Sequence, residues 1–370
     1  MRVGRGAAVT LCAVRVALTL EQCWHAVPGG TAVAALGLAE ELARRPDLKV
    51  VGVAAHHRLP PPEAFRPRVP VRQLRWPRKV VYEGWRRLSW PSVQQAVPDA
   101  DVVHATTIIV PPRRGRPLVV TVHDLAFLHE PGQFTKHGVR AFRAGLERTR
   151  RHADLVLCSS QATLDDCLFA GIGVDRVRLV PLGLAPVDRP SAADVVAVRH
   201  RLGLDRPYVL FVGTLEPRKN VGRLIAAVEA LSSGHELVLA GPLGWGDAEP
   251  PRSDRIRLVG FVDEPTKAAL YEGADVFCYP SVREGFGLPV LEAMAHGTPV
   301  VTSRGTATAE VAGTAAVLVD PLDVAAIAGG IETALARRDE LAAAGLERVS
   351  GFTWSETADR VEAGYREVVR

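Results

Sequence analysis

Short, continuously apolar runs alternate with helical segments along most of this chain. Runs such as Val14–Leu20 and Tyr208–Val212 lack the polar alternation of a strand with one wet face, which predicts strands buried on both faces of a parallel sheet. Parallel strands need helical crossovers, which are right-handed. Pro186–Ser191 has the composition of a linker. The pattern therefore predicts an α/β fold with two Rossmann-like, doubly wound parallel-sheet domains, residues 1–188 and 189–350.

The stretch Tyr279–Val301 of the second domain carries the clearest candidate site. The apolar run that ends at Cys278 is followed by a loop and then by a helix start. Pro289 suits the first helical turn, where its missing N–H costs nothing, and Gly297 followed by Pro299 ends the helix about two turns later. The sequence therefore predicts a strand, a loop and a short helix here.

Two glutamates and two glycines surround that helix start. Glu284 lies in the loop and Glu292 on the first turns, while Gly285 and Gly287 expose backbone N–H groups where a helix attracts phosphate. Carboxylates repel a bare phosphate, but they accept strong hydrogen bonds from sugar hydroxyls. The arrangement suits a nucleotide sugar, with Glu284 on the sugar, the glycines on the diphosphate and Glu292 on the ribose. The alternative is a surface glutamate, a glycine turn and a first-turn glutamate that complements the helix dipole.

Three other segments follow predicted strands, where ligands meet open α/β sheets. Gly29 and Gly30 follow the first strand, His123 ends another, and Arg218 and Lys219 follow Tyr208–Val212 on what we expect to be an exposed loop. Adjacent cations can neutralise a leaving diphosphate, arginine by a fork and lysine as a point charge. The alternative for Gly29 and Gly30 is a plain tight turn, and for His123 it is a structural histidine. For Arg218 and Lys219 it is a solvated basic turn. The turn at Gly29 and Gly30 has neither the GxGxxG pattern nor a Walker lysine, which disfavours nicotinamide binding and nucleotide-triphosphate hydrolysis. We expect no cofactor.

Charge is unevenly distributed. Arg66–Trp90 holds seven arginines and one lysine against one glutamate, a charge of +7, so the remainder sums to −3 of the net +4. Its aromatic residues are interleaved with the cations, and Val81, Trp85 and Leu88 recur at helical spacing. Such a helix suits an anionic membrane surface or a phosphorylated acceptor. The alternative is a solvated face whose tryptophans pack inward. No recognised motif accompanies the charge, so nucleic acid is not expected.

The run Gly6–Leu20 is too short to span a membrane and is interrupted by Arg15, so we interpret its end as a first strand. The five cysteines, Cys12, Cys23, Cys158, Cys167 and Cys278, are odd in number and lack metal-ligand spacing. We therefore expect the cysteines to be reduced and the protein to be cytoplasmic. If the basic stretch binds an anionic membrane, the protein would lie peripherally at its inner face.

The Glu-x7-Glu pattern, with GFGLPVLEAMA inside it, resembles the retaining nucleotide-sugar glycosyltransferases of family 4. The string GTLEPRKN is similar to the family's phosphate-binding segment, and VTVHDLAFL resembles its donor-sugar histidine region, that of mannosyltransferases in particular. The resemblance implies the GT-B fold, in which two Rossmann-like domains face each other across a cleft. It also implies retention of anomeric configuration without a dedicated metal, and a terminal helix in residues 351–370 that crosses back to the first domain.

The resemblance also implies site residues. Catalytic roles fall to Arg218, Lys219, Glu284 and His123. Donor binding falls to Gly29, Gly30, Gly213, Thr214, Phe261, Val262, Gly285, Phe286, Gly287, Leu288 and Glu292. The family commonly has a proline where this chain has Ala309, and we leave the following Glu310 out of the predicted site.

The expected function is transfer of a sugar, mannose favoured, to an acceptor hydroxyl. GDP-mannose is the leading donor, followed by UDP-sugars, and the acceptor is a glycan, a lipid-linked sugar or a small molecule. Two alternatives remain open. A nucleotide-sugar epimerase shares this fold but needs general acid and base groups at the sugar. A non-catalytic nucleotide-sugar-binding protein would need a broken site, whereas Arg218, Lys219, Glu284 and Glu292 are all present.

Overall fold

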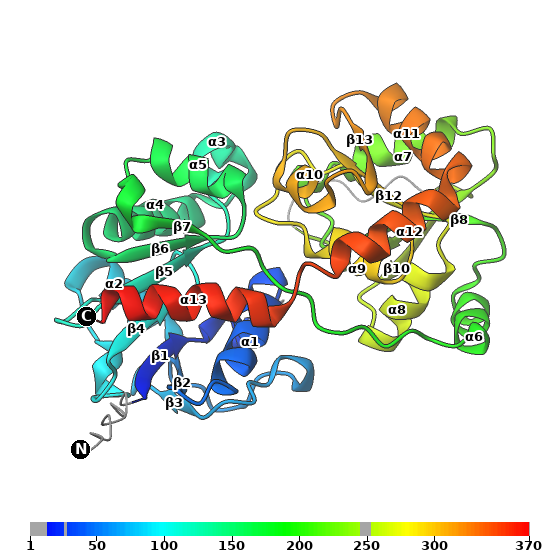
Figure 1. Ribbon diagram of the computed structural model, residues 1–370. Helices are drawn as coiled ribbons and strands as arrows, with labels where there is room; N and C mark the ends of the chain where they lie inside the picture. The colour runs from blue at the N-terminus through cyan, green and yellow to red at the C-terminus, as the bar shows by residue number, and fades with distance from the viewer. Residues whose placement is uncertain (1–12, 26–27, 245–252, 370) are drawn as a thin grey trace, which may run out of the picture.

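Two parallel sheets form the framework of the protein (Figure 1). The computed structural model describes residues 13–25, 28–244 and 253–369. Cys12 and Arg370, which the sequence analysis included among the cysteines and in the terminal helix, lie outside the described residues. The four described cysteines are buried and free, as predicted.

The first sheet has seven strands in the order β3-β2-β1-β4-β5-β6-β7, all parallel. Its elements are β1 Val14–Thr19, α1 Gly30–Ala43, β2 Leu48–Ala54, β3 Val71–Gln73, α2 Arg78–Leu88, β4 Val102–Ala105, β5 Leu118–Val122, α3 Ala126–His129, α4 Lys136–His152, β6 Leu155–Cys158, α5 Gln161–Phe169 and β7 Val177–Leu179.

The second sheet has six strands in the order β10-β9-β8-β11-β12-β13, again all parallel. Its elements are α6 Ala192–Leu202, β8 Tyr208–Val212, α7 Val221–Ala230, β9 Glu236–Ala240, β10 Ile256–Gly260, α8 Glu264–Gly273, β11 Val276–Tyr279, α9 Leu288–Ala295, β12 Val300–Ser303, α10 Ala307–Ala312, β13 Ala316–Val319, α11 Val324–Ala336 and α12 Arg338–Val349. The last helix of the chain is α13, Trp354–Val368.

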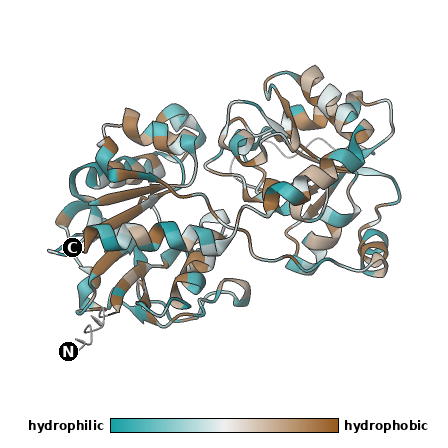
Figure 2. Ribbon diagram, in the orientation of Figure 1, coloured by the Kyte–Doolittle hydropathy of each residue, from teal (hydrophilic) through white to brown (hydrophobic). Residues whose placement is uncertain are grey.

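The central strands are buried along their whole length, which is why their sequences show no polar alternation. Every residue of β5, β8, β9 and β12 is buried, whereas the edge strand β10 is partly exposed. Figure 2 shows the strands as apolar and the outer helices as mixed. The predicted fold class, two Rossmann-like parallel-sheet domains, is confirmed.

Helix α13 leaves the second domain and packs on the first, beside α1 (Figure 1). Gly37 of α1 leaves room for the Trp354 indole, because a Cβ there would collide with the ring. At the other end, the Tyr365 hydroxyl lies 2.6 Å from Nδ1 of His104, whose Nε2 lies 2.8 Å from the Thr121 hydroxyl. Burial lowers the pKa of His104 to about 3, so this network is uncharged. The boundary at residues 188 and 189 stays a prediction.

The basic stretch Arg66–Trp90 forms β3 and α2, and its aromatic rings face inward. Trp85 is buried and its Nε1 donates to the Pro91 carbonyl over 2.7 Å, while Trp76 and Trp90 meet edge to face. Leu88, which recurs with Val81 and Trp85 at helical spacing, does not share their burial and is 72% exposed. Ser89 adopts the left-handed conformation and ends the helix there, so Leu88 lies on its last, solvated turn. Within the described residues, every helix falls short of the length and apolar content needed to cross a bilayer.

Candidate functional site

Two glycines mark where the domains approach each other. A Cβ on Gly285 would collide with the carbonyl oxygen of His123, and one on Gly30 would lie 3.9 Å from Cδ1 of Leu288. Ser159 Oγ bridges the first contact by donating to the carbonyls of Gly285 (3.0 Å) and His123 (3.2 Å). The structure therefore brings predicted site residues of both domains together.

Two helix starts meet at this junction without side-chain caps. Gly29 precedes α1 and Gly287 precedes α9, and no side-chain oxygen accepts from either helix start. Gly287 has φ +119°, and a Cβ there would lie 2.9 Å from Thr308, so the position favours glycine on both counts. By contrast, Ser160 caps α5. Free N–H groups at a helix start attract anions, and here two helix starts face one junction.

Glu284 is the centre of a cluster of two cations and two carboxylates. Its Oε1 lies 2.6 Å from Lys219 Nζ and its Oε2 3.1 Å from Arg218, which also lies 2.6 Å from Glu216. Lys219 donates a further short hydrogen bond to the Tyr279 hydroxyl. Burial opposes the charge on Glu284, but Lys219 and Arg218 outweigh it and hold the pKa at about 2. The carboxylate is therefore ionised and aimed by its partners.

The expectation that Lys219 lies on an exposed loop is wrong, because its side chain is only 9% exposed. The turn Pro217–Lys219 folds it inward, and Asn220 follows with a left-handed φ of 60°. The Asn220 side chain donates to the Pro280 carbonyl over 3.0 Å, which ties this turn to the loop that carries Glu284. Burial lowers the pKa of Lys219, and the charge of Glu284 opposes that shift.

Glu292 makes separate contacts on α9. One oxygen lies 3.1 Å from Lys267 Nζ and the other accepts from the Tyr271 hydroxyl over 2.9 Å. Burial opposes the charge of Lys267, but Glu292 and Glu264 raise its pKa above the usual value. Sequence reasoning missed Lys267 and Tyr271, which lie on a helix that carries no recognised motif.

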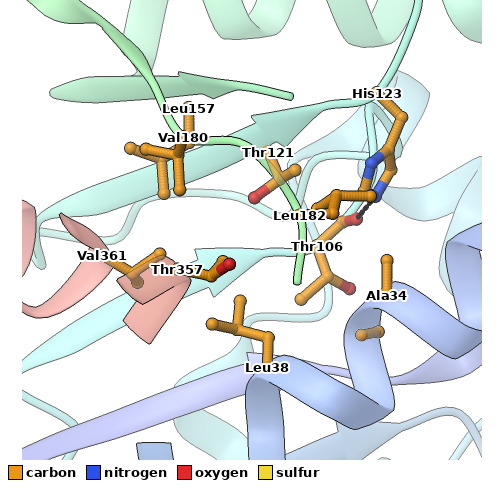
Figure 3. A pocket seen from close by; sticks show the side chains of 11 residues that line it. Ala34, Leu38, Thr106, Thr121, His123, Leu157, Val180, Leu182, Thr357 and Val361 are labelled. Carbon is orange, nitrogen blue, oxygen red and sulfur yellow. Dashed lines mark hydrogen bonds between the residues drawn. The ribbon is translucent and has the colours of Figure 1, made fainter. Parts of the chain in front are cut away.

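His123 follows β5 and points into a small cavity (Figure 3). Its Nε2 donates to the Thr106 carbonyl over 3.2 Å, which leaves Nδ1 as the acceptor. Burial lowers the pKa of His123, so the ring is neutral near pH 7. The cavity, also lined by Leu38 of α1 and Val361 of α13, has a volume of about 20 Å³, which is room for a single water.

The remaining predicted donor residues lie at the ends of β8 and β10 and at the start of α9. Gly213 has φ +149° and leads into Thr214, while Phe286 and Leu288 are buried. Phe261 is 73% exposed and Val262 half-buried, so the ring of Phe261 is open to a ligand.

A polar wall that sequence reasoning missed lies beside the carboxyl ends of β1 and β2, on the same edge of the first sheet as His123. Glu21 is buried, accepts from the backbone N–H of Ala55 over 2.7 Å and lies 2.9 Å from His57 Nε2. Trp24 stacks on the His57 ring at 5.0 Å. The charge of Arg78 acts on Glu21 too, and the guanidinium has no hydrogen-bond or ion-pair partner among the described residues. Only the fold reveals this wall, because its members come from the ends of three different strands.

Glu310, which the sequence analysis left out of the site, contacts the first domain, where its carboxylate accepts from the backbone N–H groups of Gln161 and Ala162. Over the described ranges, no three His, Cys, Asp or Glu side chains are grouped as metal ligands.

Known proteins resemble the chain over most of its length. Residues 28–186 match the family model "Glycosyltransferase Family 4" and residues 206–337 match "Glycosyl transferases group 1". The O-antigen chain mannosyltransferase B of Escherichia coli is 32% identical over 282 residues, which are 72% of this chain and 74% of that protein. The phosphatidyl-myo-inositol mannosyltransferase of Mycobacterium leprae is 38% identical over 211 residues, 53% of this chain and 55% of that protein.

Among solved structures, that of Anabaena HepE in complex with UDP and glucose superposes with a TM-score of 0.74. It covers 96% of this chain and all of its own, at 19% identity, so the likeness is one of fold.

Proposed function

The chain belongs to the family 4 glycosyltransferases, and from this premise we propose that it transfers a sugar, mannose favoured, from a nucleoside-diphosphate sugar to an acceptor hydroxyl with retention of anomeric configuration. The observation that carries the proposal is the meeting of two uncapped helix starts at Gly30 and Leu288. A diphosphate bound there would accept hydrogen bonds from both domains. The two mannosyltransferase relatives support the choice of mannose, and GDP-mannose remains ahead of UDP-sugars as donor.

In this proposal the ionised Glu284 accepts hydrogen bonds from the hydroxyls of the transferred sugar. Lys219 and Arg218 hold that carboxylate in place, and Arg218, whose side chain is the more exposed of the two, also meets the departing diphosphate. His123 is neutral and accepts a sugar hydroxyl at Nδ1. Their contribution to the rate is orientation of the sugar and stabilisation of the charge that develops on the leaving group.

The nucleotide lies on the second domain. Glu292 accepts hydrogen bonds from the ribose hydroxyls, held ready by Lys267 and Tyr271. Phe261 and Val262 contact the base, and the exposed ring of Phe261 supplies a stacking surface. Gly29, Gly213, Thr214, Gly285, Phe286 and Gly287 surround the diphosphate.

The acceptor lies on the polar wall of the first domain. The stacked pair Trp24 and His57 offers a flat face to a sugar ring, and Arg78 offers a cation without a partner among the described residues. Such a wall suits a glycan, a lipid-linked sugar or a small molecule with an anionic group. Arg78→Gln should raise the acceptor KM about tenfold and leave the donor Kd unchanged. An unchanged acceptor KM would exclude this wall.

The basic stretch Arg66–Trp90 suits the surface of an anionic membrane, which would bring a lipid-linked acceptor to the enzyme. Because Trp85 is buried, attraction would come mainly from charge, through exposed side chains such as Arg68 and Arg87, with the exposed Leu88 on the same helix as Arg87.

The donor is identified by thermal unfolding with GDP-, UDP- and ADP-sugars in turn. A donor at 100 times its Kd should stabilise the protein by about 2.7 kcal/mol. NMR of the product then gives its anomeric configuration, and donor incubated alone separates transfer from epimerisation, since only an epimerase converts the donor to another nucleotide sugar. No stabilisation by any nucleotide sugar would contradict the proposal.

A further inference from the structure

The Glu310 carboxylate joins the two domains. Its Oε2 accepts from the backbone N–H of Gln161 over 2.7 Å and its Oε1 from that of Ala162 over 2.8 Å. Glu310 lies on α10 of the second domain, while Gln161 and Ala162 open α5 of the first. Both oxygens therefore bind across the domain junction, at the positive end of a helix.

Two backbone N–H groups at the start of helix α5 have no partner within the helix or its cap. The first N–H groups of a helix have no partner within it. Ser160 Oγ, the cap, takes the N–H of Thr163. The N–H groups of Gln161 and Ala162 remain, and the Glu310 carboxylate accepts from both. A carboxylate can accept from two parallel N–H donors at once, one at each oxygen.

The same helix start holds the contact between His123 and Gly285. Thr163 donates to the His123 carbonyl over 2.9 Å, and Ser159 Oγ lies within hydrogen-bond distance of both His123 and Gly285 carbonyls. On the other side, Thr308 of α10 packs on Gly287. Whatever fixes α10 against α5 therefore fixes the glycine loop against His123.

The rest of Glu310 is anchored in its own domain. Arg348 donates to the backbone carbonyls of Glu310 (2.8 Å) and Val311 (2.9 Å). Of the atoms of Glu310, only the carboxylate reaches across the junction, which Arg283 also crosses to Asp166 of α5 over 3.3 Å. The Glu310 side chain can therefore be changed without removing one of its hydrogen bonds inside the second domain.

We propose that Glu310 is a positioning residue for sugar transfer: by binding the start of α5, its carboxylate closes the domains and presses the glycine loop against His123. The inference rests on the proposed function for its catalytic consequence, although the closure itself does not. Glu310 contacts none of the residues assigned to the nucleotide, so it acts on the arrangement of the site and not on nucleotide affinity.

Two substitutions remove the contact from opposite sides. Glu310→Gln keeps the shape but replaces one acceptor by an NH2 group that faces an N–H. Gln161→Pro removes one donor and leaves α5 intact, because proline suits the first position of a helix and Ser160 before it is already extended. Glu347→Gln, an exposed charge change on α12 of the same domain, is the control.

Small-angle X-ray scattering should give a larger radius of gyration for Glu310→Gln and Gln161→Pro, and the wild-type value for Glu347→Gln. Turnover should fall about tenfold in Glu310→Gln and by less in Gln161→Pro, while the Kd of GDP or UDP stays within about twofold of wild type. The double variant should be no slower than Glu310→Gln alone, because both changes break one contact.

A Glu310→Gln protein with the wild-type radius of gyration and turnover would overturn the inference. So would a Gln161→Pro protein with wild-type radius of gyration and turnover when Glu310→Gln is slower than the wild type. Thermal unfolding checks that each variant is folded. If the wild-type protein turns over no donor, the proposed function fails, whereas the scattering comparison still decides whether Glu310 closes the domains.

Discussion

Glu284 and Lys219 form an ion pair of 2.6 Å although each side chain is only 9% exposed. Sixty-five residues separate them in the chain, and the pair joins the loop after β11 to the turn after β8. A buried charge is stable only with a partner, so each of these side chains fixes the position of the other.

The first prediction concerns acid. The pKa of Glu284 falls from 4.5 to about 2 on folding, so its charge stabilises the native state above pH 4.5, and that contribution is lost as pH falls towards 2. A shift of this size corresponds to about 3 kcal/mol. The wild type should be more stable than Glu284→Gln at neutral pH, and the gap should shrink by about that amount between pH 4.5 and 2. Denaturant unfolding of both proteins at several pH values measures this difference in stability. A difference that does not change with pH would mean that Glu284 is not held ionised by its cations.

Lys219→Met should impair both turnover and folding stability. It deprives Glu284 of its nearest cation, and breaking a buried pair from one side typically costs about 3–5 kcal/mol. It also weakens the orientation of the carboxylate that we propose to hold the sugar, which should slow transfer about a hundredfold. Lys79→Met, on the exposed side of α2, is the matched control and should change neither. A Lys219→Met protein with wild-type stability would mean that the pair is not formed in solution.

The third prediction is that the basic stretch Arg66–Trp90 binds anionic membranes. Arg68→Glu with Arg87→Glu reverses two side chains that are 81% and 68% exposed and should weaken binding to phosphatidylglycerol vesicles. Each basic residue near such a surface contributes about 1 kcal/mol, so the loss is measurable by sedimentation. Activity on a water-soluble acceptor should persist. Arg206→Glu with Arg360→Glu, two exposed arginines elsewhere, should bind as the wild type does. If the wild type ignores these vesicles, the stretch does not bind an anionic membrane.

The fold could be predicted from sequence because burial on both faces leaves a local mark. Runs such as Tyr208–Val212 are continuous and apolar, and the observed strand has the same bounds. Strand β3 was not predicted, because it is only three residues long and two of them, Arg72 and Gln73, are polar edge residues. Local chemistry likewise predicted a glycine helix start at Gly287.

What sequence could not provide was the pairing of side chains across loops and domains. Neither the burial of Lys219 under Glu284 nor the contact of Glu310 with α5 leaves a periodic signal, since both depend on distances between elements far apart in the chain. The polar wall of Glu21, His57 and Arg78 was missed for the same reason.

We propose that a nucleotide sugar binds along α9, with its sugar on Glu284 and its ribose on Glu292. Calorimetric titration of the free nucleoside diphosphate and of the nucleotide sugar into Glu284→Gln and Glu292→Gln tests this placement. Glu292→Gln should weaken both ligands by about tenfold or more, the effect of a charged hydrogen bond. Glu284→Gln should weaken only the nucleotide sugar, and should leave the diphosphate alone unchanged or tighter, because it frees Lys219 and Arg218. If Glu284→Gln weakened the free nucleoside diphosphate as much as Glu292→Gln does, the donor would lie in another direction and the claim would be wrong.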